Sequence, residues 1–173
     1  PRRYVLISGL GFAFTSGRRG AVSILVRAMY RMALRLATKV FFQNSDDEQL
    51  FRESGLLAPS TPSVIVNGSG VDVVEYSPCA LPSDSIGFLM IGRLLGDKGV
   101  REYAQAARRV KALHPEARFR LVGWIDTNPN AIARAELDAW LADGTLEFLG
   151  KLDDVRPAIA DSTVYVLPSY REG

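Results

Sequence analysis

Phe88-Leu-Met-Ile-Gly-Arg-Leu-Leu-Gly-Asp-Lys-Gly-Val100 is the stretch of sequence that decides the fold. It begins as an apolar run typical of a buried strand and continues into a loop broken by three glycines. The loop carries two cations, Arg93 and Lys98, and a helix is predicted to open near Gly99. Two cations beside a helix N-terminus, at the carboxyl end of a strand, suit a diphosphate group. An ordinary strand–helix turn with solvated charges is the alternative, because short glycine patterns are weak evidence.

Strands and helices alternate regularly on the C-terminal side of this loop. The pattern predicts strands at 86–91, 118–122, 145–148 and 163–167, and helices at 99–113, 130–142 and 153–160. Strands separated by helices indicate βαβ units and a parallel sheet. Ligands of such sheets gather at the carboxyl ends of the strands. These ends are expected at 92–99, 123–130, 149–153 and 168–173.

The N-terminal side shows a second, shorter alternation. The pattern predicts strands at 4–7, 40–42 and 64–66, and helices at 21–38 and 45–54. Ser45 with Glu48 three residues later has the form of a capping box. We therefore expect an α/β protein with two Rossmann-like halves, each with a parallel sheet and each incomplete. The predicted domains are residues 1–74 and 86–173, joined by a proline-containing linker at 75–85.

Composition limits the class of protein. The chain has 173 residues, 47% of them hydrophobic, which is typical of a globular protein. Its one cysteine, Cys79, excludes an internal disulfide framework and a cysteine-based metal site. No stretch approaches the ~18 apolar residues of a transmembrane helix. The chain is expected to begin and end within a longer fold, so the lack of a signal peptide carries little weight.

Charge is distributed unevenly along the chain. Residues 1–45 hold eight Lys or Arg and no acid, whereas the remainder holds thirteen basic and nineteen acidic residues. Arg27, Arg31 and Arg35 recur every four residues and would form one stripe along the first helix. An apolar helix with a basic stripe is typical of an interfacial helix on anionic lipid. A core helix with a solvated arginine face fits the pattern equally well.

Few residues could perform acid–base chemistry. The single histidine, His114, stands at a predicted helix end, where a capping or surface role is expected. Asp126, Asn128 and Asn130 follow a strand end, and either ligand contact or Asx turns would explain them. Glu172 stands on the last strand-end loop, where its carboxylate could accept hydrogen bonds from sugar hydroxyls.

Three motifs together resemble a known family. Asn67-Gly-Ser-Gly-Val-Asp72, Ile91-Gly-Arg-Leu-Leu-Gly-Asp-Lys-Gly99 and Pro168-Ser-Tyr-Arg-Glu-Gly173 are similar, in order and spacing, to those of the retaining family 4 glycosyltransferases of GT-B fold. Ser8-Gly-Leu-Gly-Phe-Ala-Phe-Thr15 and Phe42-Gln-Asn-Ser-Asp-Asp47 add a narrower likeness. They resemble the bacterial subgroup of the diacetylbacillosaminyl-diphospho-undecaprenol N-acetylgalactosaminyltransferase.

The resemblance implies a reaction. A hexose or N-acetylhexosamine would pass with retention from a UDP-sugar to a polyprenyl-diphosphate-linked saccharide, in glycan or surface polysaccharide biosynthesis. Arg93 and Lys98 would neutralise the donor diphosphate, and Glu172 would contact the donor sugar as the first glutamate of a Glu-x7-Glu motif. The second glutamate would fall beyond Gly173, so this stretch alone is expected to bind weakly or to be inactive.

The resemblance also implies the surroundings of the site. The expected donor-binding residues are Gly92, Arg93, Lys98, Gly99, Gly123, Leu152, Arg171, Glu172 and Gly173. Gly68 and Gly70 would form an interdomain loop, and neither a metal nor a cofactor would be needed. The protein would lie on the cytoplasmic face of the bacterial inner membrane, as a peripheral protein that binds no nucleic acid. The residues expected to contact the anionic membrane surface are Arg18, Arg19, Arg27, Arg31 and Arg35.

Two other classes of function remain open from the residues. A nucleotide-sugar epimerase of GT-B fold would also grip a diphosphate, but it needs an acid–base pair in its cleft. A non-catalytic nucleotide-sugar-binding fragment, or a receiver- or flavodoxin-like module, would need only the C-terminal half. Two glycine-rich turns on either side of a linker argue against a single-domain module.

Overall fold

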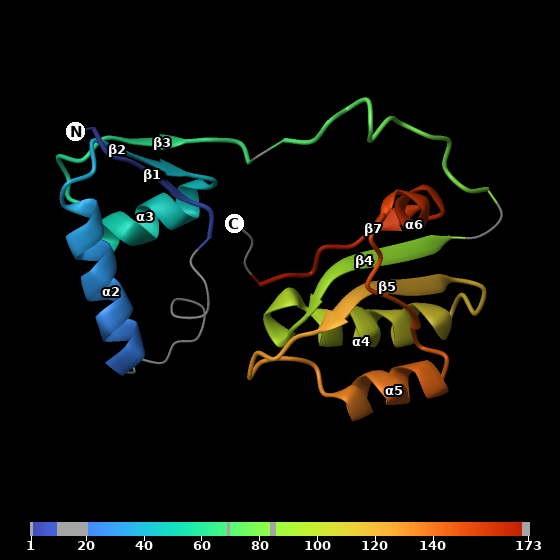
Figure 1. Cartoon of the computed structure of the whole chain (residues 1–173). Coiled ribbons are helices and arrows are strands. Elements are labelled where there is room, and N and C mark those ends of the chain that lie inside the picture. The colour runs from blue at the N-terminus through green and yellow to red at the C-terminus, as the bar shows by residue number, and fades with distance from the viewer. Residues whose placement is uncertain (1, 10–20, 69, 84–85, 171–173) are drawn as a thin grey trace. The chain divides into compact units, whose positions relative to one another are not determined.

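The computed structural model describes residues 2–9, 21–68, 70–83 and 86–170. These residues fall into two compact units, which divide between Val71 and Asp72. Each unit is built on a parallel sheet (Figure 1). The boundaries predicted for the linker, 75 and 85, stay a prediction.

The first unit is a three-stranded parallel sheet with two helices packed on one face (Figure 1). Its elements are β1 (Tyr4–Ile7), α2 (Ala21–Leu34), β2 (Lys39–Phe42), α3 (Ser45–Glu53) and β3 (Ser63–Ile65). The strand order is β1-β2-β3. Phe42 of the central strand and Phe51 of α3 are fully buried. The Phe51 ring meets the Phe42 ring edge to face, with centroids 5.4 Å apart, and the Tyr30 ring of α2 at 5.2 Å. This aromatic contact holds both helices on the same side of the sheet.

The start of α3 differs from the predicted capping box. Asn44 is the N-cap, and its side chain accepts a hydrogen bond from the Asp47 N–H at 2.7 Å. Asparagine caps a helix as well as serine does, so the cap moves one residue earlier. Glu48 is then too far along the helix to bond back to the cap. It instead pairs with Arg52 one turn later, at 3.0 Å.

The second unit is a four-stranded parallel sheet with the strand order β6-β5-β4-β7. Its elements are β4 (Gly87–Leu94), the 3-10 helix η1 (Gly96–Lys98), α4 (Val100–Lys111), β5 (Arg118–Ile125), α5 (Arg134–Ala142), β6 (Glu147–Gly150), α6 (Arg156–Ala160) and β7 (Val164–Tyr165). The predicted alternation of strands and helices is therefore confirmed. β4 and β5 are paired along their full length, from Gly87 opposite Arg118 to Leu94 opposite Ile125.

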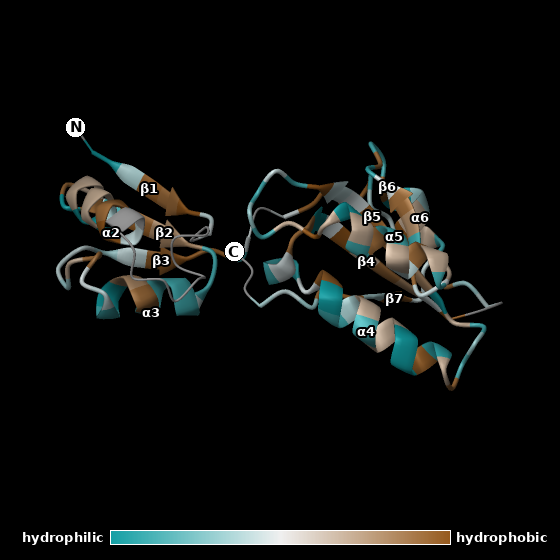
Figure 2. Cartoon of the chain, turned by 90° about the horizontal axis from the view of Figure 1, so that it is seen from below, coloured by the Kyte–Doolittle hydropathy of each residue, from teal (hydrophilic) through white to brown (hydrophobic). Residues whose placement is uncertain are grey.

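Helices cover the two faces of this sheet unequally. α4 and α5 lie on one face and the short α6 on the other (Figure 1). Met90, Tyr103 and Leu121 belong to the large core under α4 and α5. Leu89 and Val122 point to the other face and pack on α6. α4 carries both apolar and polar bands, whereas β4 is mainly apolar (Figure 2).

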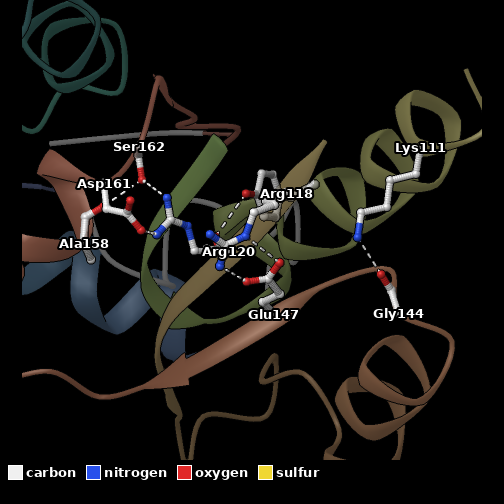
Figure 3. A network of polar contacts seen from close by, with 9 residues as sticks. Lys111, Arg118, Arg120, Gly144, Glu147, Ala158, Asp161 and Ser162 are labelled. Atoms are coloured by element: carbon white, nitrogen blue, oxygen red, sulfur yellow. Dashed lines mark hydrogen bonds and ion pairs between the residues drawn. The ribbon is translucent and has the colours of Figure 1, made fainter. Parts of the chain in front are cut away.

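A buried arginine ties α6 to the amino end of the sheet. Arg120 of β5 is 4% exposed and forms an ion pair with Asp161, just after α6 (Figure 3). Its Nη2 also donates to Ser162 Oγ at 3.2 Å. Two residues earlier, Arg118 pairs with Glu147 of β6 at 2.8 Å. These contacts fix the end of the sheet opposite to the one where ligands of parallel sheets bind.

Candidate functional site

The carboxyl edge of the second sheet gathers most of the residues predicted to bind a donor. Those that the structure describes there are Gly92, Arg93, Lys98, Gly99, Gly123 and Leu152. Gly92 and Gly123 face each other across β4 and β5. A Cβ on Gly123 would overlap the Gly92 carbonyl oxygen, so only glycine fits at position 123. The two strands therefore pack closely at this point, and the edge presents backbone rather than side chains at these two positions.

The corner between η1 and α4 supplies a cation and a helix N-terminus. Lys98 is the last residue of η1 and is half-buried. Gly99 follows with φ 74°, ends η1 and caps the twelve-residue α4. The first N–H groups of an α-helix have no acceptor within the helix, and they carry the positive end of its dipole. An anion at this corner would meet both these donors and the Lys98 ammonium.

Arg93 stands at the end of β4 with its side chain about half exposed. Its Nη1 lies 3.3 Å from Asp126 Oδ2, beyond the end of β5. The other carboxylate oxygen, Oδ1, accepts a hydrogen bond from the Asn128 N–H at 2.9 Å. Asn128 Oδ1 in turn accepts from the Asn130 N–H at 2.9 Å. The Asx-turn interpretation of these residues is confirmed, and Asp126 in addition pairs with Arg93.

The loop between β5 and α5 is docked on the loop that carries the cations. The Gly96 N–H donates to the Asn130 carbonyl oxygen, and the Ile132 N–H donates to that of Leu94, both at 2.9 Å. Ile132 is fully buried in the core. Asp126 thus approaches Arg93 from a loop that is anchored at its far end.

Trp124 and Lys151 are two residues of this edge that sequence reasoning missed. Trp124 is the register partner of Arg93 on β5, so both side chains leave the sheet on the α6 face. Trp124 is 45% exposed, and Lys151 Nζ lies 5.6 Å from the centre of its ring. Leu152 follows and packs against the small core under α6. In the sequence, the signal that could have indicated this part of the edge is a tryptophan, Trp124, just after a predicted strand.

The segment after β7 brings the described part of the last motif, residues 168–170, to the same edge. Tyr170 donates its N–H to the Asp97 carbonyl oxygen at 3.0 Å. Its hydroxyl donates to Glu102 Oε1 in the first turn of α4, at 2.6 Å. The predicted site residues Arg171, Glu172 and Gly173 lie outside the described residues.

The predicted membrane stripe on α2 is only partly available. Arg31 donates from Nε to the Gly55 carbonyl oxygen at 2.9 Å, and so satisfies the C-terminal end of α3. Arg27 and Arg35 flank it, whereas Arg18 and Arg19 lie outside the described residues. The helix also exposes apolar side chains to more than half of their area: Ile24, Leu25, Met29 and Met32. No helix in the described part of the chain is long and apolar enough to cross a bilayer.

Within the described ranges, no three His, Cys, Asp or Glu residues are grouped so that they could hold a metal ion. His114 is exposed, and its Nδ1 lies 3.5 Å from Glu116 Oε1. The expectation that catalysis needs no metal stays a prediction.

Residues 85–173 match the model of a protein family described as glycosyl transferases group 1. The match covers half of the chain, and the chain belongs to this family. The crystal structure of HepE from Anabaena, in complex with UDP and glucose, superposes with a TM-score of 0.66 at 16% identity. It aligns with 97% of this chain and 46% of its own. The predicted α/β fold of GT-B type, with two parallel sheets, is confirmed.

Two curated relatives are similar over almost the whole chain. One is the N,N'-diacetylbacillosaminyl-diphospho-undecaprenol alpha-1,3-N-acetylgalactosaminyltransferase of Campylobacter jejuni, 28% identical over 100% of this chain and 48% of that protein. The other is the UDP-Gal:alpha-D-GlcNAc-diphosphoundecaprenol alpha-1,3-galactosyltransferase of Escherichia coli, 28% identical over 94% of this chain and 45% of that protein. The chain thus spans about half the length of the curated relatives it matches.

Proposed function

We propose that this protein transfers a hexose or N-acetylhexosamine, with retention, from a UDP-sugar to a polyprenyl-diphosphate-linked saccharide. The observation that carries the proposal is the placement of Arg93 and Lys98 on either side of one loop, before the N-terminus of α4. Both curated relatives are named for transfer to a sugar on undecaprenyl diphosphate, which supports the choice of acceptor. Membership of the glycosyltransferase family supports the reaction.

The proposed chemistry follows from the charge that the reaction creates. Breaking the anomeric bond releases UDP, and negative charge develops on its diphosphate. Arg93, Lys98 and the first N–H groups of α4 would stabilise this charge where it appears. Asp126 would keep Arg93 at the strand end before the donor binds. In this proposal the two cations supply the charge for which other transferases use a metal ion, and Glu172 accepts hydrogen bonds from the sugar hydroxyls.

The test is a transfer assay with the full-length protein, UDP-sugars and a polyprenyl-diphosphate-linked saccharide. We expect Arg93→Ala and Lys98→Ala each to lower kcat/KM, with the activation free energy raised by about 2–4 kcal/mol. Glu172→Gln should lower kcat far more than it weakens binding of free UDP. Arg134→Ala, which removes an exposed arginine that pairs with Asp138 on α5, is the control and should change neither value.

Two outcomes would contradict the proposal. Near wild-type kcat/KM in both the Arg93 and Lys98 variants would place the diphosphate elsewhere. Epimerised UDP-sugar formed without any acceptor would instead indicate the epimerase alternative.

We also propose that α2 seats the protein on the cytoplasmic face of the membrane. The basic excess of residues 1–45 and the exposed apolar side chains of α2 support this location. An interfacial helix needs both, since electrostatic attraction brings it to anionic lipid and apolar burial holds it there. The saccharide acceptor, being lipid-linked, would be presented at the same surface.

A further inference from the structure

The segment after β7 is fastened to the corner of η1 and α4 at three points. The Tyr170 N–H bonds to the Asp97 carbonyl oxygen at 3.0 Å, and the Tyr170 hydroxyl bonds to Glu102 Oε1 at 2.6 Å. Between them, the Pro168 carbonyl packs so closely on Gly99 that a Cβ there would overlap it. The chain between β7 and Tyr170 is therefore held against this corner.

The side-chain contact between Tyr170 and Glu102 is not a consequence of burial. Tyr170 is 71% exposed, so little apolar area holds it in place. Its hydroxyl instead meets a carboxylate, and hydrogen bonds to an ionised acceptor are stronger than neutral ones. The bond lowers the pKa of Glu102 and raises the pKa of Tyr170. Donor and acceptor therefore keep the protonation states that the bond requires at neutral pH.

We propose that Tyr170 and Glu102 are positioning residues, which hold the chain leading to Glu172 against the corner that bears Lys98. The inference rests on the proposed function, in which Lys98 binds the diphosphate and Glu172 the sugar. Glu172 follows Tyr170 by only two residues in the sequence. In this proposal, a pair that fixes residue 170 on α4 restricts the chain just before the residue that contacts the sugar. Its loss should reduce turnover and leave the binding of free UDP intact.

The first measurement separates turnover from nucleotide affinity in the full-length protein. Tyr170→Phe removes only the hydroxyl, and Glu102→Ala removes the acceptor. We expect each to lower kcat about 5–20-fold, because a charge-assisted hydrogen bond is lost, while the Kd of UDP measured by calorimetry stays within about twofold. The double variant should be no slower than either single variant. Glu102→Gln, which keeps a neutral acceptor, should recover most of the rate.

The second measurement reads the contact without any reaction. Hydrogen exchange of the Tyr170 amide, followed by mass spectrometry, should be faster in Tyr170→Phe and Glu102→Ala than in the parent protein. Exchange in β4 and β5 should not change. Tyr76→Phe removes a hydroxyl from another exposed tyrosine and should change neither exchange nor kcat.

The outcomes separate this inference from the proposed function. If the parent protein binds no UDP and transfers no sugar, the proposed function fails and the positioning role falls with it. If the parent is active but Tyr170→Phe keeps its kcat, the positioning role alone is overturned. Losses that multiply in the double variant would also overturn it, because the two residues would then act separately.

Discussion

Arg93 and Asp126 form an ion pair across the ends of β4 and β5, with Nη1 and Oδ2 3.3 Å apart. The pair joins a cation of the candidate diphosphate site to the first residue of an Asx turn. Because the Arg93 side chain is about half exposed, the pair contributes at most about 1 kcal/mol to folding. Its effect should therefore be visible in the reaction rather than in stability.

Asp126→Ala tests this pair. We expect kcat/KM for sugar transfer to fall by about 3–10-fold, because Arg93 loses the partner that orients it. UDP should bind at least as tightly, since one negative charge near the diphosphate is gone. Asp138→Ala breaks an exposed pair with Arg134 on α5 and serves as the control. Equal kinetics in the Asp126 and Asp138 variants would contradict a role for the pair.

Gly99→Ala and Gly144→Ala form a matched pair of substitutions in the second unit. Both glycines have positive φ, 74° and 71°, so alanine is strained at either by about 1 kcal/mol. Only at position 99 would the new Cβ also overlap Pro168. In urea denaturation we expect Gly144→Ala to lower the unfolding free energy by about 1 kcal/mol and Gly99→Ala by about 2–4 kcal/mol. Similar losses would mean that the close contact with Pro168 relaxes without cost.

Asp161→Ala tests the network at the amino end of the sheet (Figure 3). Arg120 is buried, so its charge would lose its nearest counter-ion while remaining out of water. We expect the unfolding free energy to fall by about 3 kcal/mol, as measured by urea denaturation. Asp161→Asn, which keeps an acceptor for the guanidinium, should lose less. A loss below about 0.5 kcal/mol would show that Ser162 and nearby water satisfy Arg120 on their own.

The lowered pKa of Asp143 predicts that the stability of the folded protein depends on pH. Hydrogen bonds from Thr145 and then Arg108 lower the pKa of Asp143 from 3.8 to about 2. A carboxyl whose pKa is lower in the folded protein favours folding above its unfolded pKa, and that contribution disappears as pH falls through the folded value. Asp143→Asn should therefore lower stability at pH 7 and flatten the decline between pH 3.8 and about 2. Parallel stability curves for parent and variant would contradict this.

Arg27 of α2 and Arg35, which follows the last residue of α2, predict membrane binding that depends on anionic lipid. Each basic residue at an anionic surface contributes about 1 kcal/mol, so Arg27→Ser with Arg35→Ser should weaken vesicle binding about 10–30-fold at low salt. Arg31 is left unchanged because its hydrogen bond to Gly55 supports the end of α3, so its loss would also affect folding. The difference should shrink as salt shortens the Debye length.

Co-sedimentation with vesicles of varied anionic content measures this effect. Arg109→Ser, an exposed position on α4, is the control. Equal binding of parent and double variant, or binding that ignores lipid charge, would refute the electrostatic interpretation.

The order of elements could be predicted from the sequence because apolar runs and glycines mark them clearly. Their ends were less accurate, and β4 and β5 show why. The strands were expected to end at residues 91 and 122, just before Gly92 and Gly123, since glycine weakens a strand pattern. The two glycines lie opposite each other, so the backbone ladder continues past them to Leu94 and Ile125.

The pairwise contacts of the site could not be predicted in the same way. The Arg93–Asp126 contact joins residues that are 33 positions apart in the sequence. The Tyr170–Glu102 contact joins residues that are 68 positions apart. Such contacts depend on register and on the course of loops, which a local pattern does not contain. The predicted helix at 130–142 illustrates this, because it begins only at Arg134. Asn130 and Ile132, which precede the helix, instead form backbone hydrogen bonds to Gly96 and Leu94 and so hold the β5–α5 loop against the end of β4.

The glycine pair at the strand ends also has a consequence for attempts to alter ligand preference by directed evolution. Position 123 admits no side chain, because a Cβ there would overlap the neighbouring backbone, whereas a Cβ at position 92 would meet nothing within 4 Å. A randomised library should therefore leave Gly123 fixed and vary Gly92 together with Trp124. New side chains at those two positions would reshape the rim of the edge without breaking the pairing of β4 with β5.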